Sequence, residues 1–338
     1  LGRISGGIVY YTYLLKRNTG SFRTPEEITR LLSEQLQADV QELQELSARY
    51  QQLTGHTPDS ASTLFPFPFE DAQEILTDLQ QRMQDDFPPL SALTDVPVSC
   101  TAKTVSESLQ DYTSPAFYLI PPLDDLTENV IYVNPASTRP GLELYTTLAH
   151  EGYPGHLYQT VYSRLYENSI TDNPVRGVIS FNGFVEGWAY YVENISYDYA
   201  ADVLLENGGT EADQVLVQLL CLERNLQINL YCLLDLSIHY YGADQEDVFR
   251  SLAAFGISDT TTAGAIYDYI RREPATYLKY YLSYLEILSL KEEAQELWKE
   301  QYSDLRFHTF LLQTGPSDFV NLEKRLREQN PGAQQPKV

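Results

Sequence analysis

The stretch His150-Glu151-Gly152-Tyr153-Pro154-Gly155-His156 decides how the surrounding chain folds. Leu144 and Leu148 precede it at a four-residue spacing, which predicts an apolar helix face that ends near the first histidine. Pro154 lacks the N–H group that would bond the carbonyl four residues before it. Gly155 tolerates unusual dihedral angles. The sequence therefore predicts a break in the helix between the two histidines.

A divalent metal ion would explain why two histidines stand beside a carboxylate. Zinc hydrolases use neutral imidazoles and a carboxylate as ligands and leave one position open for water. A second carboxylate, which does not bind the metal, accepts the proton of the water. His150 and Glu151 match the first half of the H-E-x-x-H arrangement, but the second histidine, His156, comes at i+6 instead of i+4. On an unbroken helix the two rings would lie roughly 120° apart, so a shared metal requires the break. The alternative is that both histidines are ordinary polar residues beside a Pro-Gly kink.

A further carboxylate ligand is expected from the apolar helix that begins near Asn182. Glu186 and Glu193 lie seven residues apart on nearly the same face of this helix, and burying an unpaired carboxylate is expensive. We favour Glu186 as the ligand because Gly183 and Gly187 permit close approach of another helix. The opposite assignment, with Glu193 on the metal and Glu186 behind it, stays open.

Composition excludes several classes of protein. The 338 residues include 23 Lys and Arg against 47 Asp and Glu, giving a net charge of −24, which disfavours binding to nucleic acids and anionic lipid surfaces. A hydrophobic content of 43% is typical of globular proteins. No stretch reaches the roughly 18 apolar residues of a membrane span.

The chain as a whole reads as mostly α-helical with one small β-sheet. Thr24-Pro25-Glu26-Glu27 is a helix start signal, and an apolar stripe follows it to about residue 50. Two strands, Ala116–Ile120 and Asn129–Asn134, are predicted on either side of a turn at Pro121–Glu128. The other predicted helices cover residues 71–83, 142–153, 157–168, 183–200, 211–241, 245–254, 262–271, 276–300 and 304–312.

Five sequence blocks in a fixed order carry a resemblance to a known family. They are His150 to His156 followed by Gln159; Tyr118 to Asp124 with Ile131 to Asn134; Glu186-Gly187-Trp188-Ala189-x-Tyr191; Asp235-x-x-x-His239; and Phe307-His308-x-x-Leu311-Leu312-x-x-Gly315. This pattern resembles the bacterial family called domain of unknown function 885, whose members look like zincin-like metallopeptidases. The chain departs from the family at Ser283, where a glycine is usual, and at Tyr231, where an arginine is frequent.

The resemblance implies a fold and a set of roles. It implies a zincin-like fold, with residues 1–110 as a helical scaffold region and 111–338 as the catalytic region, together forming one compact unit. His150, His156 and Glu186 would hold one zinc ion, and Glu151 would be the general base. The candidate donors to the oxyanion are Tyr280, His239 and His308. The strand Ile131–Asn134 would bind an extended peptide by β-addition.

The leading hypothesis is a zinc-dependent peptidase that acts on a peptide or a related small amide. The alternative is a non-catalytic binding or scaffold protein that keeps a zincin-like shape. Family members run longer at the N-terminus, so the resemblance implies that this chain is their C-terminal portion. It also favours export or the cell envelope, although the residues themselves do not exclude the cytoplasm. The sequence does not distinguish amino-terminal, carboxy-terminal and internal cleavage, and it does not give the oligomeric state.

Overall fold

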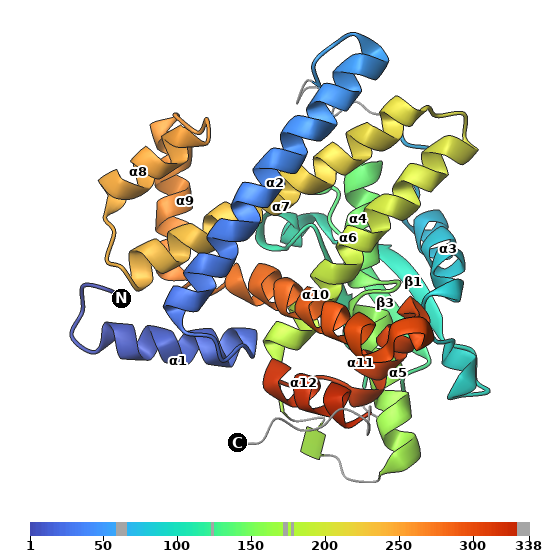
Figure 1. Cartoon of the computed structure of the whole chain (residues 1–338). Coiled ribbons are helices and arrows are strands. Elements are labelled where there is room, and N and C mark those ends of the chain that lie inside the picture. Colours follow the sequence, from blue (N-terminus) through green and yellow to red (C-terminus); the bar gives the residue numbers. More distant parts are fainter. Residues whose placement is uncertain (59–65, 123–124, 172–174, 177–178, 330–338) are drawn as a thin grey trace.

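A computed structural model describes the chain except for residues 59–65, 123–124, 172–174, 177–178 and 330–338 (Figure 1). The described residues are mostly α-helical with one small sheet, so the predicted fold class is confirmed at this level. The helices are α1 (Gly7–Thr19), α2 (Pro25–Thr54), α3 (Ala72–Arg82), α4 (Leu142–Glu151), α5 (His156–Ile170), α6 (Asn182–Glu206), α7 (Glu211–His239), α8 (Gln245–Ala254), α9 (Thr260–Arg272), α10 (Leu278–Trp298), α11 (Asp304–Thr314) and α12 (Phe319–Glu328). The strands are β1 (Ser99–Thr104), β2 (Ala116–Leu119) and β3 (Glu128–Val133).

The long helix α2 begins where the sequence predicts. The side chain of Thr24 accepts a hydrogen bond from the backbone N–H of Glu27, and the side chain of Glu27 accepts one from the backbone N–H of Thr24. Pro25 occupies the first turn. Ile28 and Leu32 lie on the buried face of α2, which packs along α7 (Figure 1). The sequence analysis did not predict helices α1 and α12, which are present in the structure.

The sheet has the order β1-β3-β2. The two predicted strands pair antiparallel, with Tyr118 opposite Ile131, and residues 123–124 of the turn between them lie outside the described residues. Strand β1 was not predicted, because Ser99 to Thr104 is a mainly polar segment with little hydrophobic alternation. It pairs parallel with β3, so the boundary expected near residue 110 falls between two strands of one sheet.

This strand order makes one prediction wrong. β3, which contains the predicted docking strand Ile131–Val133, is hydrogen-bonded on both sides and has no free edge for a peptide. Sequence alone could not reveal this, because the partner on its second side is the unpredicted strand β1. Strand β2 lies at an edge of the sheet, so one of its two sides is not paired with another described strand. Strand β2 also contacts α4.

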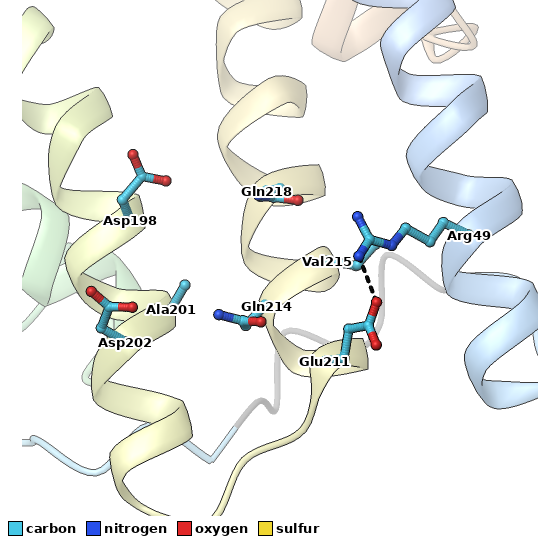
Figure 2. A pocket seen from close by; sticks show the side chains of 8 residues that line it. All are labelled: Arg49, Asp198, Ala201, Asp202, Glu211, Gln214, Val215 and Gln218. Carbon is cyan, nitrogen blue, oxygen red and sulfur yellow. Dashed lines mark hydrogen bonds and ion pairs between the residues drawn. The ribbon is translucent and has the colours of Figure 1, made fainter.

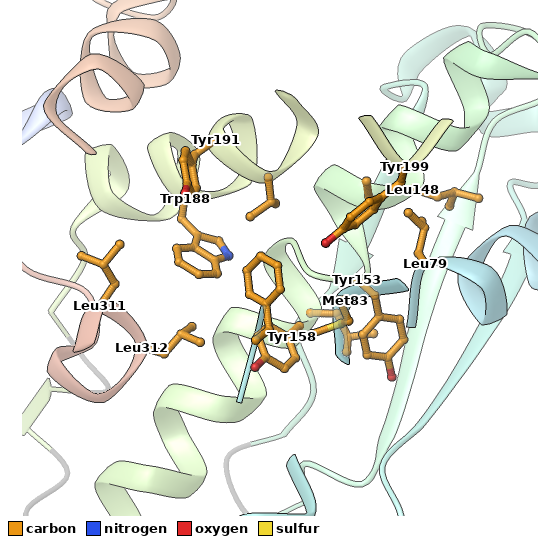
Figure 3. Close-up of a cluster of buried hydrophobic side chains, with 14 of the residues drawn as sticks. Leu79, Met83, Leu148, Tyr153, Tyr158, Trp188, Tyr191, Tyr199, Leu311 and Leu312 are labelled. Carbon is orange, nitrogen blue, oxygen red and sulfur yellow. The ribbon is translucent and has the colours of Figure 1, made fainter. Parts of the chain in front are cut away.

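Helix α6 passes through the main core. Its buried residues are mainly apolar and follow most of its length, which is typical of a helix packed on several sides. Figure 3 shows Trp188 and Tyr191 of α6 among side chains from several elements, including Tyr158 of α5 and Leu311 of α11. The core therefore fixes α6 against the helices on either side of the Pro-Gly break.

Helices α8 and α9 form a small pair against one end of α7 (Figure 1). Val248 and Leu252 of α8 and Ile270 of α9 pack with apolar residues of α7 in a separate core cluster. Within the residues that the structure describes, no helix has the length and apolar character needed to cross a membrane.

Candidate metal centre

The predicted break between the two histidines is present. Helix α4 ends at Glu151 and α5 begins at His156, so His150 and His156 belong to different helices. A Cβ atom at Gly155 would lie 1.8 Å from the carbonyl oxygen of His150, so only glycine fits this turn. The carbonyl of Pro154 accepts a hydrogen bond from the indole N–H of Trp188 at 2.9 Å, which ties the turn to α6.

The break brings the two imidazoles together. The ring centroids of His150 and His156 are 4.8 Å apart, with the ring planes nearly perpendicular. One oxygen of Glu186, Oε2, lies 3.3 Å from Nε2 of His156 and 3.8 Å from Nε2 of His150. Two atoms bound to one zinc ion at about 2.0–2.1 Å in tetrahedral geometry are roughly 3.3 Å apart. Both distances from the imidazole nitrogens to the Glu186 oxygen are therefore close to the spacing expected around one zinc ion.

Glycines bring Glu186 to this position. A Cβ atom at Gly183 would lie 2.0 Å from the backbone oxygen of Thr19, and one at Gly187 would lie 2.6 Å from the Cβ atom of Ser283. Helix α6 thus approaches α1 and α10 more closely than any larger residue would allow, as predicted from these glycines.

Glu193 occupies the opposite side of His150. Its Oε2 atom accepts a hydrogen bond from Nδ1 of His150 at 2.9 Å, and its Oε1 atom lies 3.4 Å from Nε of Arg224. Metal-binding histidines commonly donate their second N–H to a carboxylate in this way, which fixes the ring orientation. Of the two assignments left open by the sequence, the geometry favours Glu186 facing the metal and Glu193 behind His150.

Glu151 also lies near both imidazoles. Ligand atoms of His150, Glu151 and His156 all lie within 4.8 Å of one another, so either Glu151 or Glu186 is close enough to complete the ligand set. One oxygen of Glu151 accepts a hydrogen bond from the backbone N–H of Tyr118 in β2 at 2.9 Å. Glu186 places one oxygen opposite Nε2 of both histidines, so the geometry favours Glu186 over Glu151 as the carboxylate that would complete a metal site.

The carboxylates of the site favour positive charge on or beside His150. Burial tends to lower the pKa of His150, but hydrogen bonds to Glu186 and Glu193 outweigh it and raise the pKa to about 10. Burial likewise tends to raise the pKa of Glu186, yet its hydrogen bonds to His150 and His156 hold that pKa far below the usual range. A proton on His150 or a metal ion can supply the positive charge, so the two compete for the site.

Two neighbouring residues of α10 complete the surroundings. Nζ of Lys279 lies 3.2 Å from Oε1 of Glu186, the oxygen that faces away from the histidines. The ring of Tyr280 lies 6.2 Å from that of His150. Burial, the charge of Glu186 and hydrogen bonding to it raise the pKa of Tyr280, so its hydroxyl remains protonated. Sequence analysis missed Lys279, because a single lysine carries no signal of its own.

The other two predicted oxyanion donors, His239 and His308, lie outside this group of residues. Nε2 of His239 donates to the carbonyl of Ile270 at 2.9 Å, where α7 meets α9. Nδ1 of His308 donates to the carbonyl of Asp86 at 2.6 Å, and its ring stacks on Phe87 at 4.1 Å. Both imidazoles are buried and hydrogen-bonded elsewhere, and no described contact joins either of them to His150, His156 or Glu186. We therefore assign them to packing.

Two cavities in the described part of the chain lie outside the His150–Glu186 group. Figure 2 shows a cavity of about 140 Å³ between α2, α6 and α7, where Arg49 pairs with Glu211 near Asp198 and Asp202. A larger cavity of about 680 Å³ is lined mainly by residues 80–98, together with Tyr153 and Tyr158. Neither contains the imidazole and carboxylate arrangement of the candidate metal centre.

Comparison with known families settles the relationship suggested by the motifs. Residues 3–326 match the family described as "Bacterial protein of unknown function (DUF885)". The chain belongs to this family. No curated protein matches the chain.

Two solved structures share the fold. One, described as the "putative lipoprotein" from Colwellia psychrerythraea, has a TM-score of 0.74 at 20% identity, covering 98% of this chain and 57% of that one. The other, from Shewanella oneidensis, is described as a "putative lipoprotein of unknown function". It has a TM-score of 0.71 at 17% identity, covering 94% of this chain and 59% of that one. The chain thus spans less than two thirds of the length of either structure.

Proposed function

We propose that this DUF885 protein is a zinc-dependent peptidase. The observation that carries the proposal is the convergence of Nε2 of His150, Nε2 of His156 and Oε2 of Glu186, with pairwise distances to the carboxylate oxygen of 3.3 and 3.8 Å. His150, His156 and Glu186 would hold the ion, and Glu193 would orient His150 through its hydrogen bond to Nδ1. A helix-borne His-Glu pair, a second-helix glutamate and an adjacent small sheet support classing the fold as zincin-like.

A zinc ion held there would supply Lewis acidity and would bring the pKa of a bound water molecule near neutrality. Glu151 accepts a proton of the attacking water and later delivers it to the leaving amine. The bond between carbonyl carbon and nitrogen breaks, the hydroxyl of the water joins the carbon, and the proton ends on the amine. The protonated hydroxyl of Tyr280 donates a hydrogen bond to the oxyanion.

Strand β2 positions an extended peptide beside this centre. The N–H of Tyr118 points away from β3, because it donates to Glu151. The neighbouring side chains of Leu119 and Ile120 are 53% and 59% exposed. An outer strand edge of this kind binds peptide backbone by β-addition. The edge of β2 replaces the predicted role of β3.

The descriptions of the two structural neighbours as lipoproteins support an envelope location as part of the proposal. Their greater length leaves room for substrate contacts that this chain does not contain. Peptides and small amides remain the proposed substrates.

The test combines metal analysis with Glu151→Gln. The protein purified without chelators is expected to hold about one zinc per chain. Glu151→Gln keeps the size of the side chain and removes the base, so zinc remains while peptide hydrolysis falls by at least about 100-fold. Glu143→Gln, an exposed glutamate at the start of the same helix, is the matched control and keeps full activity.

Two results would contradict the proposal. One is the absence of stoichiometric metal in the wild-type protein. The other is full retention of the protein's biological effect in Glu151→Gln, which would favour the alternative of a non-catalytic binding protein.

A further inference from the structure

Four tyrosines lie together on a partly exposed surface next to the candidate metal centre. Tyr231 of α7 and Tyr269 of α9 each contact Tyr277, with ring centroids 5.0 and 5.7 Å away. Tyr280, three residues after Tyr277, lies against His150. Tyr269 is 49% exposed, and the other three are half-buried. We call Tyr231, Tyr269, Tyr277 and Tyr280 the tyrosine surface.

Arg224 stands at one end of this surface. It precedes Tyr231 by seven residues on α7, so both side chains lie on nearly the same helix face. Its side chain is 45% exposed. Within the described residues, its hydrogen bonding is limited to the contact of Nε with Glu193, so both terminal NH₂ groups remain available.

The local charge differs from that of the whole chain, which carries −24. Three carboxylates surround the site: Glu151, Glu186 and Glu193. Against these stand Arg224, Lys279 and the doubly charged ion of the proposed function, so the occupied site is net positive. Lys279 is engaged with Glu186, which leaves Arg224 as the exposed cation. An anionic group of the substrate is therefore attracted to Arg224.

We propose that Arg224 and the tyrosine surface bind the C-terminal end of a peptide, so that the protein releases the last one or two residues. This inference rests on the proposed peptidase function. A terminal carboxylate lies roughly 4–7 Å beyond the bond that is cleaved, and Arg224 is separated from His150 by a single side chain, Glu193. The guanidinium fork matches a carboxylate with two parallel hydrogen bonds. The tyrosine rings pack against the side chain of the terminal residue and favour an aromatic one.

The test uses two peptides that differ only at the C-terminus. One N-acylated tetrapeptide ends in phenylalanine as the free acid, and the other ends in phenylalanine amide. We expect the wild-type protein to hydrolyse the acid with a kcat/KM about 30-fold higher than the amide. Arg224→Met brings this ratio close to 1, mainly through KM for the acid, and Arg224→Lys restores part of it.

A matched control separates recognition from structural support. Arg49 is also a partly exposed arginine paired with one glutamate, Glu211 of α7, but it lies at the distant cavity of Figure 2. Arg49→Met is expected to leave the acid-to-amide ratio unchanged. Zinc content measured for every variant shows whether the loss of Arg224 disturbs Glu193 and His150.

A second measurement does not depend on turnover. Calorimetry compares the binding of N-acetylphenylalanine and N-acetylphenylalanine amide to the zinc-loaded protein. The acid is expected to bind about 30-fold more tightly, and Arg224→Met removes the difference.

The outcomes distinguish the two proposals. Equal hydrolysis and equal binding of acid and amide by the wild type overturn the C-terminal assignment and leave the peptidase function standing. If Arg224→Met lowers kcat/KM for the acid and the amide by the same factor, the C-terminal assignment is also overturned. That pattern would mean that Arg224 acts only by holding Glu193 in place. Absence of zinc and of hydrolysis of either peptide overturns the peptidase function itself.

Discussion

His150 and His308 both lie on helices, and both are largely shielded from solvent, but their partners differ. His150 bonds Glu193 and faces Glu186, and these carboxylates raise its pKa to about 10. Burial lowers the pKa of His308 to about 4, although its hydrogen bond to the carbonyl of Asp86 acts in the opposite direction. Its other hydrogen-bond partner is the hydroxyl of Tyr191. Carboxylates prepare one imidazole to hold a cation, whereas neutral partners keep the other uncharged.

The different partners distinguish two histidines that the sequence blocks alone do not distinguish. Both stand in recognisable blocks, so sequence resemblance assigned both to the site. Their tertiary partners differ, since His308 stacks on Phe87 and bonds the carbonyl of Asp86, whereas His150 bonds Glu193. A motif residue can be required for packing as well as for chemistry.

The largest expected effect is on metal affinity and compares the histidine pair of the candidate centre with His308. His156→Ala removes the imidazole that would bind zinc together with His150, so zinc affinity should fall by about three orders of magnitude. His308→Gln should keep wild-type affinity. Competition with a chromophoric chelator measures both, and a large loss in His308→Gln would abolish the distinction.

A smaller effect is expected at the residue that orients His150. Glu193→Gln keeps a hydrogen-bond acceptor but removes the charge, so zinc affinity should fall by about 10- to 100-fold. Glu211→Gln, a charge-neutralising change at the exposed start of α7, is the control and should leave the affinity unchanged. An unaltered affinity in Glu193→Gln would mean that Glu193 does not support the metal centre.

The smallest effect concerns pH and stability in the metal-free protein. The folded pKa of His308 lies below its unfolded value near 6.5, so its contribution to stability is complete above about pH 6.5 and is lost as the pH falls toward 4. The folded pKa of His150 lies above its unfolded value, so its contribution is complete below about pH 6.5 and is lost as the pH rises toward 10.

Denaturant unfolding across this range should show these two slopes with opposite signs. Subtracting the profile of His308→Gln from that of the wild type isolates the acidic window, and His150→Gln isolates the alkaline one. Slopes of the same sign for both histidines would contradict the assignment of their partners.

Local signals in the sequence predicted much of the fold. The capping box at Thr24, the antiparallel strand pair, the helix break at Pro154 and the close approach at Gly187 are all present. Each depends on the chemistry of a few neighbouring residues, such as a missing N–H group or an absent Cβ atom. Helix α1 and strand β1 escaped prediction because their patterns are weak and partners far along the chain stabilise them.

The candidate site divides in the same way. The amino-acid sequence by itself determined which side chains could hold a metal: His150, Glu151, His156 and one of two glutamates on α6. Only the tertiary structure decided that Glu186 faces both imidazoles and that Lys279 pairs with Glu186 and Arg224 with Glu193. It also decided that β3 is paired on both sides, whereas β2 is paired with one described strand. The physical reason is that ligand identity is a property of single residues. Distances between atoms on different helices depend on how the whole core packs.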